Sequence, residues 1–350
     1  MVNIKRLFDS HALWLSMLIG ALCYQWLVPL KPVLPWLIFF MLFFTFCKVN
    51  PLDLRLHRWH WVVLAVQLAF SFAAYYALMA WTDNPILAQG LLLCFIMPTA
   101  TAAPIIAGKL GGSIQNLTTF TLLSNFATSI VVPAFFPIVN PAADMTFWSA
   151  FLLLLSRISP LLLGPFFSAW LLRIGYNRYY SRQGRKKSCD EPASPREFTL
   201  SPGLAQIPFY LWVASIVVLT AVVTETTLSN FHDQISNIVI LLLLSFLACC
   251  MQFGLGKLIG YLLPAPSKGK DYQDVLVNPA AAPKTMAGVS SITAGQAFGQ
   301  KNTSLGVWMA QTYLHPMASL GAAAYIIWQN IFNSLQLFIA ARKKIDRNEA

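Results

Sequence analysis

Apolar residues dominate the chain from Leu13 to Ile339, in long runs separated by short polar joints. A helix needs about 20 residues to cross the hydrocarbon core of a membrane, and most of these runs reach that length or exceed it. The pattern therefore predicts ten membrane-spanning helices, at approximately 11–29, 33–48, 60–81, 86–108, 114–138, 147–174, 205–228, 235–263, 285–312 and 316–341. The joints are rich in Pro, Asn, Asp and Gly, which favour turns, as at residues 83–85 (DNP) and 140–141 (NP).

The composition supports this interpretation. The chain is 57% hydrophobic and only 11% charged, whereas about a quarter of the residues in an ordinary soluble domain are charged. We therefore interpret residues 1–350 as a single all-α domain. This domain is a polytopic membrane protein that contacts membrane lipid.

Basic residues are concentrated on one side of the predicted bundle. Lys and Arg cluster at both termini and in the joints near 49–59, 109–113, 175–204 and 264–284. The joints on the other side carry Lys31 and the acids Asp83, Asp144 and Asp233. Because cytoplasmic loops hold the Lys/Arg excess, we expect both termini and the loop 175–204 to face the cytoplasm, with the protein in the cell membrane.

The net charge of +11 follows from the same bias. Binding of nucleic acid would require basic residues gathered on a soluble face, so we do not expect it. The basic segment 182–187 (RQGRKK) has two interpretations, contact with anionic lipid or an anchor that sets the topology.

The joint at residues 140–141 divides the predicted helices into two sets of five, 11–138 and 147–341. Because five is odd, the two sets would cross the membrane in opposite orientations and form an inverted repeat. The fourth helix of each set contains helix-breaking residues, at 97–104 (MPTATAAP) and at 299–302 (GQKN). Interrupted helices at equivalent places in inverted halves indicate the substrate site of a transporter. We expect broken helices 4 and 9 to cross, with Pro98 and Thr101 close to residues 300–303.

Lys301 is the most informative single residue. No other charged residue lies between Thr285 and Leu314, so Lys301 lies roughly 24 Å and 20 Å from the two ends of this span. A charge at such depth costs about 2.5–3.5 kcal/mol on insertion scales unless a polar partner or cavity receives it. We favour a solvated pathway over a lysine that only bonds carbonyls for packing.

Arg157 is the second charge deep within an apolar run, and the sequence leaves its role open. It either attracts an anionic substrate in a cleft or pairs with a carbonyl for support. Buried amides and hydroxyls need hydrogen-bond partners, which makes several polar residues near the breaks further candidates. The predicted substrate and ion pathway comprises Pro98, Thr99, Thr101, Asn125, Arg157, Gln296, Gln300, Lys301, Asn302 and Thr303.

These motifs resemble those of the bile acid:sodium symporter family (solute carrier family 10). The resemblance rests on residues 97–103 (MPTATAA) followed by Gly111-Gly112, and on residues 299–306 (GQKNTSLG) followed by His315-Pro316. It covers nearly the whole chain in span count, half-repeat and motif order. The family's fold implies a core domain around crossed helices 4 and 9, and a panel domain of helices 1, 2, 6 and 7. Substrate would bind between the two domains, and rocking of one against the other would give alternating access.

The chain departs from the sodium-coupled members at the residues that bind the ion. Those members carry a Ser-Asn pair where this chain has Ala103 and Pro104, and an acid where it has Ala297. A glutamine of the family is here Lys301, the feature of a divergent branch of the family. Sodium requires oxygen ligands, which an ammonium cannot supply, so these departures argue against sodium coupling through the usual sites. The Lys301 ammonium would either stand in place of the ion or cycle a proton.

The sequence therefore predicts a secondary transporter that moves a small organic anion by alternating access, with a proton, sodium or no coupling ion. We expect no enzymatic activity, cofactor or metal site. The six cysteines show no ligand spacing, and the thirteen acids lie essentially in loops or at span ends. Two alternatives remain: a membrane sensor or regulatory protein without transport, and an intramembrane transferase. The second would need clustered carboxylates to hold a metal.

Overall fold

A computed structural model describes residues 14–49, 54–141, 145–187, 201, 203–265 and 285–348. Within these residues the chain forms helices and no β-strand. Residues 14–22 are helical. The elements that follow are α2 (Tyr24–Leu27), η1 (Val28–Val33), α3 (Leu34–Phe46), α4 (Arg58–Thr82), α5 (Pro85–Ile96), α6 (Ala103–Lys109), α7 (Ile114–Val139), α8 (Phe147–Lys187), η3 (Leu204–Gln206), α9 (Ile207–Ser229), α10 (Phe231–Leu262), α12 (Met286–Gly299), α13 (Thr303–Tyr313), η4 (Pro316–Ala318) and α14 (Ser319–Asn348).

Six stretches of the described residues are long and apolar enough to cross a membrane, judged by length and composition. They are Tyr24–Phe46, Arg58–Thr82, Ile114–Val139, Phe147–Tyr179, Ile207–Ser229 and Phe231–Leu262. Large apolar side chains such as Trp81, Trp26 and Leu22 are exposed on the helices or at their ends, as expected of surfaces that face lipid rather than water. The all-helical, multi-pass membrane class predicted from the sequence is therefore confirmed.

Two predicted spans prove to be pairs of shorter helices. The span expected at 86–108 consists of α5 and α6, and the span expected at 285–312 consists of α12 and α13. The interruptions fall at residues 97–102 and 300–302, where the sequence placed the breaks. Pro98 lacks the N–H that would continue α5, which explains the end of that helix.

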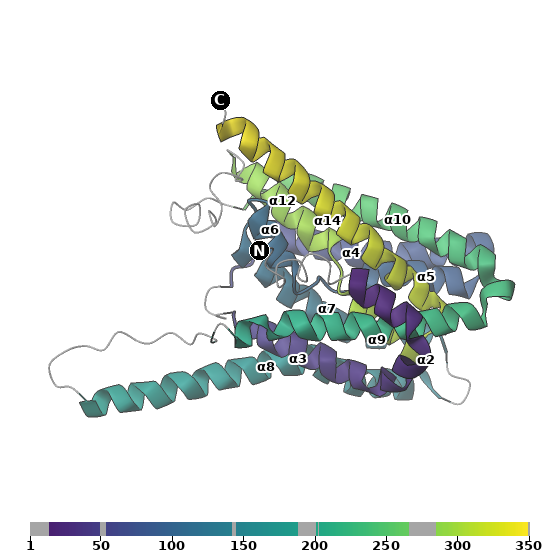
Figure 1. Cartoon of the computed structure of the whole chain (residues 1–350), viewed down its shortest axis with the longest axis horizontal. Helices are drawn as coiled ribbons and strands as arrows, with labels where there is room; N and C mark the ends of the chain where they lie inside the picture. Colours follow the sequence, from purple (N-terminus) through teal and green to yellow (C-terminus); the bar gives the residue numbers. More distant parts are fainter. Residues whose placement is uncertain are drawn as a thin grey trace.

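Other boundaries differ from the expected ones. Helix α8 continues to Lys187, so the loop expected at 175–204 begins as a helix, and residues 188–200 lie outside the described part. Figure 1 shows this end of α8 extending beyond the other helices. The joint between the first two predicted spans, 11–29 and 33–48, falls in a 3₁₀ segment, η1, which follows α2 directly and leads directly into α3.

The helices pack in two groups (Figure 1). Helix α3 packs against α8 and α9, and these three lie together along one side of the molecule. Helix α10 packs against α12, α14 and α5 on the other side. Helix α7 contacts α8, its neighbour along the chain, and helix α13 contacts both α9 and α14.

Two glycines set the close approach of α10 and α12. A Cβ atom at Gly260 would lie 2.2 Å from the backbone oxygen of Ser290, and one at Gly256 would lie 2.5 Å from that of Ala294. Glycines four residues apart let helix backbones approach closely in a membrane, where van der Waals packing drives association. This contact positions α12, and hence the interruption that follows it.

Candidate functional site

The two helix interruptions meet, as the sequence predicted. Thr99 and Lys301 pair as an isolated antiparallel bridge. On either side of this pair, Asn302 N donates to the Pro98 oxygen at 2.8 Å, and Ala100 N donates to the Gln300 oxygen at 3.0 Å. Backbone groups that the breaks release from their own helices are therefore satisfied by the other break, which a buried position requires.

Side chains from three other helices and from the second break satisfy the last carbonyls of α5 and the carbonyl that follows it. Beyond Ile96 the chain leaves the helix, so the carbonyls of residues 94–97 lose their usual helical partners. Their oxygens accept hydrogen bonds, in order, from Gln252 Nε2 at 3.0 Å, Lys301 Nζ at 3.0 Å, Thr128 Oγ1 at 3.4 Å and Gln67 Nε2 at 3.0 Å. The end of α5 is thus a buried, acceptor-rich site enclosed by side chains from α4, α7, α10 and the break before α13.

Lys301 supplies the positive charge in this site. Its side chain is 1% exposed, and Nζ lies 5.1 Å from the centre of the Phe298 ring besides bonding to the Phe95 oxygen. No carboxylate among the described residues pairs with Lys301. The C-terminal end of a helix carries a partial negative charge, so the end of α5 favours the ammonium there. The lysine bonds a carbonyl in this structure, and the solvated pathway stays a prediction.

Several polar atoms around the breaks have no hydrogen-bond partner among the described residues. Three of them are the side-chain oxygens of Gln67, Asn125 and Gln252, whose amide nitrogens donate to backbone carbonyls. The fourth is the side-chain nitrogen of Asn302, whose oxygen caps α13 by accepting from Leu305 N at 3.3 Å. Buried polar groups normally have hydrogen-bond partners. These four atoms are therefore positions at which water or a solute could form hydrogen bonds near the two breaks.

Thr99 fixes the first break to the surrounding helices. Its backbone N–H donates to Ser124 Oγ at 2.8 Å, and its hydroxyl donates to the Ala297 oxygen at 2.7 Å. Pro98 is buried and Thr101 is half-buried within the same break. Thr303 is buried and begins α13.

Gln296 and Gln300 belong to the site but face α14. Gln296 Nε2 donates to Gln336 Oε1 at 3.0 Å, and Gln300 Nε2 donates to Gln296 Oε1 and to Asn333 Oδ1. Nine of the ten residues predicted for the pathway are therefore in or beside the two breaks. Their spacing along the sequence indicated the breaks, but it did not identify the amides of α14.

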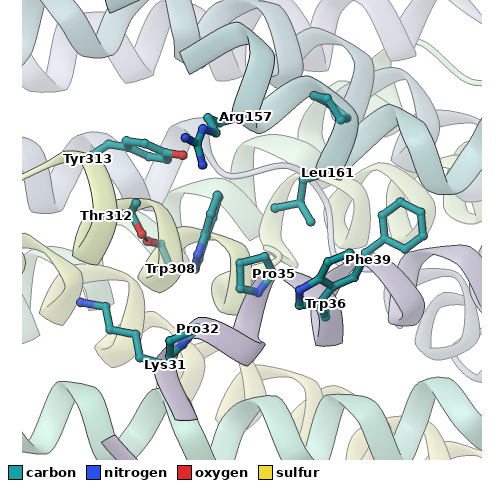
Figure 2. Close-up of a pocket in the computed structure, with 11 residues that line it drawn as sticks. Lys31, Pro32, Pro35, Trp36, Phe39, Arg157, Leu161, Trp308, Thr312 and Tyr313 are labelled. Carbon is teal, nitrogen blue, oxygen red and sulfur yellow. Dashed lines mark hydrogen bonds between the residues drawn. The ribbon is translucent and has the colours of Figure 1, made fainter. Parts of the chain in front are cut away.

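Arg157 is the exception, because it lines a separate pocket of ≈ 630 Å³. Figure 2 shows its guanidinium pointing toward the hydroxyl of Tyr313. The pocket lies between η1 and α3, α8 and α13, and its lining residues are Lys31, Pro32, Pro35, Trp36, Phe39, Arg157, Pro160, Leu161, Trp308, Thr312 and Tyr313. No residue of either break lines this pocket, so the expectation that Arg157 shares a pathway with the breaks stays a prediction.

A second cation, Lys31 of η1, also lines this pocket. Its Nζ donates to the backbone oxygen of Gln311 at 3.3 Å and to Gln311 Oε1 at 3.4 Å, which links η1 to α13. Aromatic side chains form much of the remaining wall. Two cations beside aromatic rings suit an anion with an apolar body. The sequence analysis assigned Lys31 to a joint, and nothing in its local sequence indicated a pocket.

Among the described residues, no group of three or more His, Cys, Asp or Glu side chains could hold a metal ion. No family model matches the chain, and the search of curated proteins found no match. The functional interpretation therefore rests on the geometry of the two breaks and of the pocket.

Proposed function

We propose that the chain is a secondary transporter that carries a small organic anion across the cell membrane by alternating access. The observation that carries this proposal is the meeting of two interrupted helices around the buried Lys301. Broken helices inside a membrane are tolerated where they are enclosed by protein or line a cavity, and in transporters they form the substrate and ion sites.

The proposed architecture has ten spans in two inverted halves, 11–138 and 147–341, with both termini cytoplasmic. The resemblance to the bile acid:sodium symporter family supports it, because that family has crossed helices in the same two places. The packing of α3 against α8 and α9, and of α10 against α12 and α14, supports a division into a panel and a core.

The pocket between these groups is the proposed entry site for the anion. Arg157 and Tyr313 would bind the charged group, and Trp36, Phe39 and Trp308 would contact an apolar body. Helix α8 belongs to the first group, and α13 packs more extensively against α14 of the second group than against α9 of the first. Movement between the groups would therefore change the shape of the pocket and the environment of the anion together.

Lys301 is the proposed internal cation, in place of a coupling sodium ion. Sodium at a broken helix binds backbone carbonyls, and here the ammonium already bonds the Phe95 oxygen. If Lys301 stays charged through the cycle, replacing sodium with potassium leaves uptake unchanged. If Lys301 exchanges its proton, uptake follows the proton gradient.

The test has two stages. Purified protein is first screened for thermal stabilisation by organic anions, with and without sodium and across pH. A stabilising anion is then used for uptake into proteoliposomes under imposed sodium or proton gradients, for wild type, Lys301→Gln and Lys257→Gln. Lys257 is the matched control, because it is a half-buried lysine of α10 whose side chain lies against Gly295 of α12, outside the two breaks.

We expect wild type to take up the anion without a sodium gradient. The uptake rate of Lys301→Gln should be lower by at least about tenfold, which corresponds to about 1.4 kcal/mol. Uptake by Lys257→Gln should be close to that of wild type. If no organic anion is bound or taken up, the transport proposal is wrong. Strict dependence on a sodium gradient, with Lys301→Gln unaffected, would show that the lysine has only a structural role.

A further inference from the structure

Three residues on one face of α14 hold the interruption between α12 and α13. Tyr325 donates its hydroxyl to the Gly299 oxygen at 2.8 Å, and Asn333 Oδ1 accepts from Gln300 Nε2 at 3.3 Å. Between them, Gln329 makes two hydrogen bonds to the backbone of Lys301. The three residues are spaced four apart, so they lie one above another on the same helix face.

The two bonds from Gln329 reach both polar groups of the Lys301 backbone, whose oxygen also accepts from Thr303 N at 2.9 Å. Gln329 Oε1 accepts from Lys301 N at 2.9 Å, and Gln329 Nε2 lies 3.4 Å from the Lys301 oxygen, to which it donates. In a continued helix the Lys301 N–H would donate to the Ala297 oxygen, but that oxygen accepts from the hydroxyl of Thr99 instead. The side chain of Gln329 therefore replaces a helical partner that is already in use.

The backbone bridge explains why this partner must come from α14. The hydrogen bonds that join the two breaks involve the residues on either side of Thr99 and Lys301, so these two form a pair without direct bonds between them. In such a pair, each residue points its own N–H and C=O away from the opposite segment. The N–H and C=O of Lys301 thus face α14, where the carboxamide of Gln329 bonds them as a third strand would.

The first break bonds the residues on either side of Lys301, and Gln329 bonds Lys301 itself, so this backbone is held from two sides. The Lys301 side chain extends toward the end of α5, where Nζ bonds the Phe95 oxygen at 3.0 Å. We infer that Gln329 is a positioning residue that sets the location of the Lys301 ammonium at the end of α5. An effect of Gln329 on transport rests on the proposed role of Lys301 as internal cation. The effect of Gln329 on the location of the ammonium does not depend on that role.

Loss of Gln329 should separate the ammonium from the α5 carbonyls. The carbonyl oxygens at the end of α5 would then have no cation beside them and would attract another one. Sodium binds oxygen ligands of this kind. We therefore expect the melting temperature of Gln329→Met to be several degrees higher in sodium chloride than in choline chloride at equal ionic strength. Methionine preserves the volume of the side chain and removes both hydrogen bonds, so packing is retained.

The controls separate positioning from a general loss of stability. For wild type and for Asn330→Met, the melting temperature should be the same in the two salts. Among the described residues, the Asn330 amide donates to Ile326 of its own helix and to neither break. The melting temperature of Lys301→Met should rise in sodium as that of Gln329→Met does. The rise for the double variant should be no larger than the rise for Lys301→Met alone. Gln329→Asn, which keeps the amide, serves as the second variant should Gln329→Met not be obtained folded, and it should show a smaller response to sodium.

A melting temperature of the Gln329 variant that falls equally in both salts overturns the inference, whatever Lys301→Met does. The measurement needs no transport, so this proposal and the transport proposal fail separately. Absence of anion uptake by wild type contradicts transport alone.

Discussion

At the scale of single residues, the buried hydroxyls around the breaks act as partners for particular backbone groups. Ser124 is fully buried, and its Oγ accepts the N–H of Thr99. An N–H that loses its acceptor inside a protein costs about 1–3 kcal/mol, because neither water nor another acceptor replaces the bond. The same argument applies to Thr128 and Gln67, which bond the last carbonyls at the end of α5.

Ser124→Ala should therefore lower the melting temperature of the purified protein by several degrees. Ser156→Ala is the matched control, because Ser156 is exposed and its hydroxyl donates to the Leu153 oxygen of its own helix. The melting temperature of this variant should stay close to that of wild type. Equal melting temperatures for the two variants would show that the Thr99 N–H does not depend on Ser124.

Arg157 allows a prediction about the pocket. Arg157→Gln removes the charge that points toward Tyr313, and it should weaken binding of an anion found in the stabilisation screen by about tenfold or more. The loss should shrink at high salt, because screening already weakens an exposed charge. Binding by Arg178→Gln, on the same helix outside the pocket, should be unchanged. Equal affinities of wild type and Arg157→Gln would exclude this pocket as the anion site.

At the scale of helices, packing through small residues decides where the broken segments lie. Gly256 and Gly260 bring α10 against α12, and α12 in turn leads into the break at Lys301. The sequence contained this glycine pair, but the partner helix depends on contacts between residues that are distant along the chain.

Gly260→Val should destabilise the protein by about 1–3 kcal/mol, because the added carbon atoms would meet the backbone of Ser290. Gly254→Val, on the same helix with open space around its Cβ position, should have little effect. The comparison is made by the fraction of detergent-solubilised protein that remains monodisperse after heating. A loss as large in Gly254→Val as in Gly260→Val would show that the effect comes from the helix itself and not from this contact.

At the scale of the whole molecule, the proposed orientation in the membrane is a prediction from the basic ends of α8 and α14. The last part of α8 carries Arg178 and the sequence beyond it continues with basic residues, while α4 ends at an acidic joint with Asp83. The Lys/Arg excess predicts that these two ends lie on opposite sides, with the α8 end in the cytoplasm.

In a cysteine-free background, Trp81→Cys should react with a membrane-impermeant thiol reagent added to intact cells, because Trp81 is exposed near the outer joint. Tyr179→Cys, which is also exposed, should react only after the membrane is permeabilised. Labelling of both positions in intact cells would contradict the proposed ten-span topology.

The sequence by itself determined the class of the protein, the places where helices break and the presence of one charged residue within an apolar run. These follow from local properties: the length of apolar runs, the missing N–H of Pro98 and the absence of other charges near Lys301. Each of these properties depends only on the local sequence and on the solvent around it.

The tertiary structure alone decided which groups meet. A helix that is apolar on all sides gives no signal of which face contacts which neighbour. The sequence therefore could not show that Gln329 bonds Lys301, that Lys301 bonds the Phe95 oxygen, or that Arg157 and Lys31 line one pocket apart from the breaks. These pairings join residues far apart in the chain, and close packing and hydrogen-bond satisfaction select them only when all the helices are in place.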